Sequence, residues 1–201
     1  MTRAERRKYI ESVLANRTPS PAQVEAEKRS AKSQRARRKG EAFQERIATD
    51  LLRIGKQIEL DEWDTRSRAV SGHGEDIMFS PPAWNRFGRP WIECKHYRRK
   101  FNIERVFDQH AQKCHRRDKP GYEGIPIVVH RCNHQPILAT MREVDLIALG
   151  GQPPESALRT GELVTVAWQD VLQVLARKVA AGGPLMPSVE PVLDAEDMPP
   201  F

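Results

Sequence analysis

The sequence predicts an α/β domain in which a mixed sheet is flanked by helices. Apolar residues recur at helical spacing across residues 43–54 and 103–115, and short apolar runs typical of strands lie between and after these segments. The order of helix, strands, helix and strands indicates a sandwich of helices and sheet, because each amphipathic element must bury its apolar side against another. No internal repeat is visible.

The N-terminal segment predicts helices outside the folded domain. Residues 1–15 favour a short helix, and Ser20 with Pro21 offers an N-cap followed by proline at the first helical position. Gln23 follows Ser20 by three residues, where its side chain completes a capping box. The stretch that follows has little apolar content, so we expect an exposed or partly disordered helix. Residues 1–36 are thus a basic extension.

The folded domain is expected over residues 37–141. Its first helix, at 43–54, ends at Gly55. The other expected elements are a possible strand at 58–63, a loop at 65–74, short strands at 77–79 and 90–95 with a turn at 85–89 between them, a helix at 103–115, and strands at 125–131 and 136–141. Beyond them we expect a C-terminal extension, 142–183, with a helix at 168–181, and a flexible tail, 184–201.

The charge of the chain favours an anionic partner. The 201 residues carry a net charge of +6, with twelve basic and four acidic residues among the first forty. That segment alone is therefore +8, which leaves −2 for the remainder. A basic arm on a near-neutral body is typical of nucleic-acid binding, although a solvated helical face has the same composition.

The sequence also indicates the cellular location of the protein. No apolar run approaches the ~18 residues of a membrane helix, and no apolar segment of a secretory signal follows the basic start. The three cysteines are widely spaced, which fits a reduced protein better than a disulfide scaffold. We expect a cytoplasmic protein of a bacterium or a phage-infected cell.

Three charged residues carry the predicted chemistry. Side chains alternate along a strand, so Glu93 and Lys95 share one face, and Asp76 opens the preceding short strand. If the two strands pair, the three groups converge, and two close carboxylates favour a hard cation such as Mg2+ or Mn2+. Such a site can hydrolyse a phosphodiester with a metal-activated water that Lys95 orients or helps to deprotonate. The alternative is a surface ion pair at the end of a strand.

Several segments together resemble the archaeal and phage-encoded Holliday-junction resolvases of the PD-(D/E)xK nuclease superfamily. They are Arg38-Lys39-Gly40 before a helix, Arg68-Ala69-Val70-Ser71-Gly72, Asp76-Ile77, and Ile92-Glu93-Cys94-Lys95. The resemblance covers residues 37–141. It implies a restriction-endonuclease-like fold, a Mg2+-dependent (or Mn2+-dependent) homodimeric endonuclease, and paired nicks across four-way DNA junctions that leave 5′-phosphate ends.

The resemblance also implies roles for single residues. Asp76, Glu93 and the backbone carbonyl of Cys94 would bind the metal, and Lys95 would be the catalytic lysine. The family's other active-site positions fall on Ser71, in a loop, and Gln109, on the second helix. The resemblance places Arg68 against a DNA phosphate. Other candidate DNA contacts follow from charge and position alone, with ordinary solvated loops as the alternative: Arg38, Lys39, His73, Arg98, Arg99 and Lys100.

One position departs from the family pattern. The family carries a glutamate four residues after the helix-opening glycine, where this chain has Gln44. Glu45, which we favour, or Glu41 would replace it; the alternative is that Gln44 itself serves as a neutral oxygen ligand with weaker affinity for the metal. Two other functions stay open: a nuclease of this fold for flap, single-stranded or duplex DNA, and a DNA-binding protein whose site has decayed.

Overall fold

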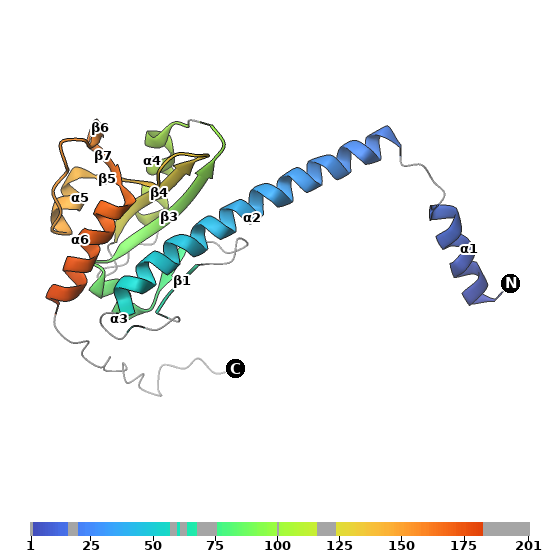
Figure 1. Cartoon of the computed structure of the whole chain (residues 1–201), viewed down its shortest axis with the longest axis horizontal. Coiled ribbons are helices and arrows are strands. Elements are labelled where there is room, and N and C mark those ends of the chain that lie inside the picture. Colours follow the sequence, from blue (N-terminus) through green and yellow to red (C-terminus); the bar gives the residue numbers. More distant parts are fainter. Residues whose placement is uncertain are drawn as a thin grey trace, which may run out of the picture. The chain divides into compact units, whose positions relative to one another are not determined.

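The computed structural model describes residues 2–15, 20–56, 60, 64–67, 76–99, 101–115 and 124–182. The chain divides into two compact units, Met1–Lys39 and Gly40–Phe201. Figure 1 labels the helices and all strands but β2.

The N-terminal unit is helical and exposed. It holds helix α1, Arg3–Ala15, and the first part of helix α2, Pro21–Gly55. The predicted capping box is confirmed: the backbone N–H of Ser20 donates to Gln23 Oε1 at 2.8 Å, and the N–H of Gln23 donates to Ser20 Oγ at 3.3 Å. From Ser20 to Lys39 every residue except Val24 is exposed, so this part of α2 contributes surface rather than core.

The second part of α2 is the predicted amphipathic helix. Phe43, Ile47, Leu51 and Ile54 are all buried, as their spacing predicts. The helix does not start near them, however, because α2 continues without a break from Pro21. Local propensity explains this continuity, since the preceding stretch is rich in Ala, Lys and Arg.

A five-stranded mixed sheet forms the centre of the second unit. Its strands lie in the order β3 (Pro90–Tyr97), β4 (Ile125–Cys132), β5 (Leu138–Arg142), β7 (Leu163–Ala167) and β6 (Leu158–Thr160). Strands β3 and β4 are parallel, with helix α4, Ile103–His115, between them in the chain. All other neighbours are antiparallel. The predicted mixed sheet flanked by helices is thus confirmed.

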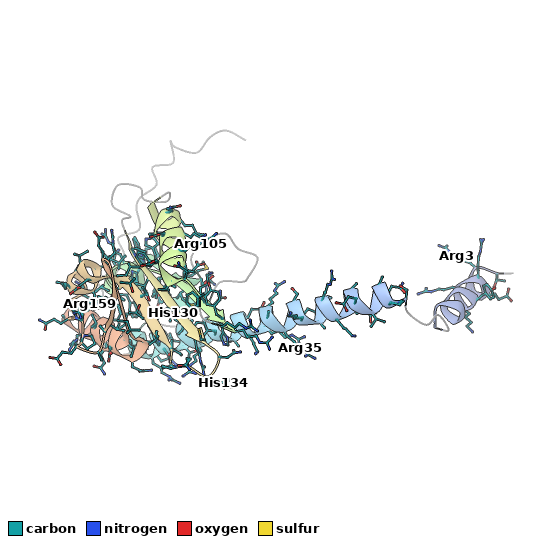
Figure 2. All side chains as sticks on the ribbon, turned by 90° about the horizontal axis from the view of Figure 1, so that it is seen from above. Arg3, Arg35, Arg105, His130, His134 and Arg159 are labelled. Atoms are coloured by element: carbon teal, nitrogen blue, oxygen red, sulfur yellow. The ribbon has the colours of Figure 1, made fainter. Side chains whose placement is uncertain are left out.

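Helices cover both faces of this sheet (Figures 1 and 2). Helix α6, Trp168–Ala181, lies beside α2, and the Trp168 indole N–H donates to Asp50 Oδ2 at 3.2 Å. Helix α4 lies on the opposite face, where His110 Nε2 is 2.8 Å from the carbonyl oxygen of Trp91 in β3. Successive side chains of β3 therefore point toward helices on opposite sides of the sheet.

The segment before β3 differs from the prediction. Thr65–Ser67, expected as a loop, is strand β1, and it pairs antiparallel with β2, Ile77–Phe79, in a separate two-stranded sheet. Pro81 does not merely end β2 but opens helix α3, Pro81–Arg86, where Ser80 is the N-cap. The predicted strand at 58–63 lies largely outside the described residues.

The expected boundary after Met141 is not a boundary of the folded unit. Helix α5, Glu143–Ala148, follows β5 directly, and β7 pairs with β5 from Leu138↔Ala167 to Arg142↔Leu163. Strand β7 therefore belongs to the sheet, between β5 and the edge strand β6, although its short apolar run was not predicted as a strand. Among the described residues, no helix has the length and apolar character needed to cross a membrane.

Candidate functional site

Strand β3 brings Glu93 and Lys95 together, as the alternation of its side chains predicts. Lys95 Nζ donates to Glu93 Oε1 in a direct ion pair. Glu93 is only 4% exposed, whereas the side chain of Lys95 is 34% exposed. Glu93 therefore lies at the floor of the site, and Lys95 lies between it and solvent.

Asp76 joins this pair through the backbone of β3. Its N–H donates to the carbonyl oxygen of Ile92 at 3.0 Å, and its Oδ2 accepts from the N–H of Cys94 at 2.7 Å. These two bonds hold Asp76 against β3, although β2 itself is hydrogen-bonded to β1 and not to β3. Because N–H and C=O of one strand residue point to the same side, the Cys94 carbonyl also faces Asp76.

Helix α2 contributes Gln44, and not Glu45. The side-chain amide of Gln44 donates a hydrogen bond to Asp76, and Gln44 is buried. Glu45 is exposed, which corrects the preference for Glu45 as the neighbour of Asp76. The reason is helical geometry: Gln44 borders the buried stripe of Phe43 and Ile47, whereas the next residue has rotated out of it.

Helix α4 contributes two residues that the sequence did not single out for this site. His110 Nδ1 lies 3.8 Å from Glu93 Oε2, and Lys113 Nζ lies 3.5 Å from Glu93 Oε1. Gln109, the residue expected here, is exposed. The missed signal was periodicity, because His110 continues the apolar spacing of Ile103 and Phe107 and must therefore face the sheet.

Burial and charge act in opposite directions on the two carboxylates. Burial raises the pKa of Asp76, and the negative charge of Glu93 raises it further. Burial also opposes ionisation of Glu93, but the Lys95 ammonium and its hydrogen bond outweigh it and lower the pKa of Glu93. Burial tends to lower the pKa of Lys95, yet the charge of Glu93 outweighs that and raises it. Lys95 is therefore an ammonium at neutral pH.

The donors in this site fit a hard divalent cation. Asp76, Glu93 and the Cys94 carbonyl offer oxygen ligands, and a cation relieves the mutual repulsion of the buried Glu93 and half-buried Asp76 carboxylates. Within the described part of the chain, no group of three or more His, Cys, Asp or Glu side chains is placed to hold a metal. Two carboxylates match the way proteins bind Mg2+, which keeps several waters and shares substrate phosphate oxygens.

The remaining predicted residues are exposed or fall outside the described residues. Arg98 and Arg99, which follow β3, are exposed, and so are Arg38 and Lys39 in the N-terminal unit. Four others fall outside the described residues: Arg68, Ser71, His73 and Lys100.

Comparison of the chain with protein-family models, with curated proteins and with solved structures found no match.

Proposed function

We propose that this protein is a divalent-metal-dependent endodeoxyribonuclease with a restriction-endonuclease-like PD-(D/E)xK fold, and that its substrate is branched DNA such as the four-way junction. The nuclease chemistry is supported by the residues of the site. The choice of branched DNA is supported by the resemblance of residues 37–141 to junction resolvases and by the basic character of the first forty residues.

One observation carries the proposal: the charged side chains of Asp76, Glu93 and Lys95 lie together in one part-buried site. Asp76 accepts a hydrogen bond from β3 between Glu93 and Lys95, which themselves form an ion pair. A surface ion pair does not need a second carboxylate beside it, and burying that carboxylate costs several kcal/mol unless a cation compensates. A protein that only binds DNA has no use for clustered carboxylates that repel phosphate.

Each residue then has a distinct role. Asp76, Glu93 and the Cys94 carbonyl would hold Mg2+ or Mn2+, which supplies polarisation of the phosphate and a water of lowered pKa. Because the pKa of Lys95 is raised, its ammonium donates hydrogen bonds to the attacking water and the phosphate rather than accepting a proton. Gln44 keeps the Asp76 carboxylate oriented by its hydrogen bond.

The test is cleavage of a synthetic four-way junction beside matched duplex, flap and single-stranded DNA, with Mg2+, with Mn2+ and with EDTA. We expect metal-dependent nicks in opposed strands of the junction, with 5′-phosphate ends. Cleavage of duplex, flap or single-stranded DNA instead would support the proposed catalytic site but contradict the four-way junction as its substrate. Binding without cleavage under every metal condition would contradict the enzyme and support a DNA-binding protein.

Asp76→Asn isolates the site. The change removes a charge that holds the cation, so we expect cleavage to fall by at least ~100-fold while junction binding stays equal or tightens. Asp170→Asn is the matched control, because Asp170 is an exposed carboxylate in the first turn of α6. Unchanged cleavage in Asp76→Asn would remove Asp76 from the mechanism.

A further inference from the structure

Lys113 occupies an unusual position for a surface lysine. Its ammonium lies 3.5 Å from Glu93 Oε1, the same oxygen to which Lys95 donates, yet its side chain is 58% exposed. On the other side of the carboxylate, His110 Nδ1 faces Oε2 at 3.8 Å. Besides His110, Glu93 thus has two lysine partners: Lys95 on its own strand, and Lys113, a mostly solvated side chain that reaches it from α4.

The two lysines respond differently to an additional cation. A divalent ion on Glu93 repels both ammoniums, and it competes for the oxygen that they share. The side chain of Lys95 is 34% exposed and projects from β3, whereas that of Lys113 is 58% exposed and reaches Glu93 from α4 with the ammonium at the end of its flexible stem. Lys113 can therefore return to solvent when a divalent cation takes its place beside Glu93, because most of its side chain is already solvated.

We propose that Lys113 is a mobile counter-ion, which neutralises Glu93 when no divalent cation is bound and contacts a DNA phosphate when the cation takes its place. This inference rests on the proposed function and names a phosphate-contacting residue for the same site. The displaced ammonium stays at the rim of the site, where the scissile or a neighbouring phosphate must approach, and ammonium groups bind phosphate oxygens with strong charge-assisted hydrogen bonds.

The first test measures Mn2+ binding to the full chain without DNA, by calorimetry or by the electron-spin resonance of free Mn2+. Lys113→Met removes the competitor for Glu93, so we expect Mn2+ to bind about two- to fivefold more tightly. Lys113→Arg keeps the charge and should bind Mn2+ like the wild type. Asp76→Asn should weaken Mn2+ binding strongly, which identifies the measured site.

The second test measures DNA binding by fluorescence anisotropy, once with EDTA and once with Ca2+ as the divalent cation. The measurement reports binding and does not depend on cleavage. Because Lys113 is released from Glu93 only when a cation is bound, Lys113→Met should weaken DNA binding several-fold in Ca2+ and much less in EDTA. In Ca2+, the slope of log affinity against log salt concentration should also become shallower by about 0.9, the value expected for one lost phosphate contact.

Arg105→Met is the matched control. Arg105 is an exposed cation on the same helix, two turns before Lys113, and Figure 2 labels it. The control should leave Mn2+ affinity unchanged and alter DNA binding equally in EDTA and in Ca2+. A Lys113→Met protein that matches this control in both measurements overturns the proposal, and so does Mn2+ binding that becomes weaker.

These tests separate the inference from the function it rests on. If the wild type binds Mn2+ and DNA but cleaves nothing, the proposed function fails, while the two binding comparisons still decide the role of Lys113. If Asp76→Asn binds Mn2+ as tightly as the wild type, Mn2+ does not occupy this site and the counter-ion role of Lys113 is overturned.

Discussion

Glu93 shows how single residues set the charge balance of this site. Burial alone would favour its neutral form, but Lys95, His110 and Lys113 all lower its pKa. Burial and the charge of Glu93 raise the pKa of Asp76, and they outweigh Lys95 and the hydrogen bonds from Cys94 and Gln44, which lower it. The pKa values of the two carboxyl groups are therefore pushed apart, so Glu93 ionises more readily than Asp76, and a bound cation would favour the ionised form of Asp76.

His130 is a buried histidine outside the candidate metal ligands. Its Nε2 lies 3.0 Å from Thr140 Oγ1, which is 2.7 Å from Thr165 Oγ1, and the ring of Phe101 meets it edge-on at 5.2 Å. In the sheet, His130 stands beside Lys95. Burial lowers the pKa of His130 from 6.5 to about 4. The folded protein thus holds a neutral imidazole.

This pKa predicts a loss of stability in mild acid. Below the unfolded pKa of 6.5 the unfolded chain takes up a proton that the folded chain resists until about pH 4. The contribution is full above 6.5 and is lost as the pH falls between the two values, by roughly 2 kcal/mol near pH 5. Urea unfolding, followed by tryptophan fluorescence at neutral pH and near pH 5, measures it.

His130→Gln is the control for this prediction, because it removes the titrating group and retains hydrogen-bonding capacity. The variant should start less stable but should lose about 2 kcal/mol less than the wild type on acidification. Equal losses in both proteins would assign the acid sensitivity to other groups.

At the scale of elements, α2 presents a basic stripe in the N-terminal unit. Lys28, Lys32, Arg35 and Lys39 follow one another at intervals of four, three and four residues, which places them along one side of the helix. All four are exposed, and Figure 2 labels Arg35 among the side chains of this segment. We call these four residues the α2 stripe.

The α2 stripe predicts a salt-dependent contribution to DNA affinity. If it contacts phosphates, Lys28→Gln with Lys32→Gln should weaken binding to any DNA and reduce the slope of log affinity against log salt by up to about 0.9 for each residue removed. Arg29→Gln with Arg37→Gln removes the same charge from other sides of the helix and should have a smaller effect. Equal slopes in the wild type and both double variants would indicate that the basic segment is an ordinary solvated helix that does not contact DNA.

At the scale of the whole molecule, the candidate site ties together α2, β3 and α4. Gln44 comes from α2, Glu93 and Lys95 come from β3, and Lys113 comes from α4. Asp76, at the start of β2, is held by the backbone of β3. Because the site exists only when these elements are packed, a cation that binds it must bind the folded state in preference to the unfolded state.

This linkage predicts that a divalent cation stabilises the fold. At a concentration one hundred times the Kd, Mn2+ should add about 2.7 kcal/mol to the free energy of unfolding, or roughly 5–10 °C in Tm for a chain of this size. A thermal melt with Mn2+ and then with excess EDTA measures it. Asp76→Asn should abolish the shift and Asp170→Asn should keep it; a wild-type Tm that ignores Mn2+ would argue against a metal site.

The sequence by itself determined the features that depend only on residues close together in the chain. The predicted helices at 103–115 and 168–181 match α4 and α6, and the capping box at Ser20 is present. Periodicity and caps act within a few residues, so they can be read without the fold. The common face of Glu93 and Lys95 follows in the same way, from the alternation of side chains along one strand.

Only the tertiary structure decided which elements meet. It paired β2 with β1 rather than with β3, added β7 to the sheet, and turned Gln44 rather than Glu45 toward Asp76. It also aimed His110 and Lys113 at Glu93, in place of the expected Gln109. The physical reason is that strand pairing and the rotation of a helix about its axis are set by burial against distant segments, and a one-residue difference in either changes which side chain reaches the site.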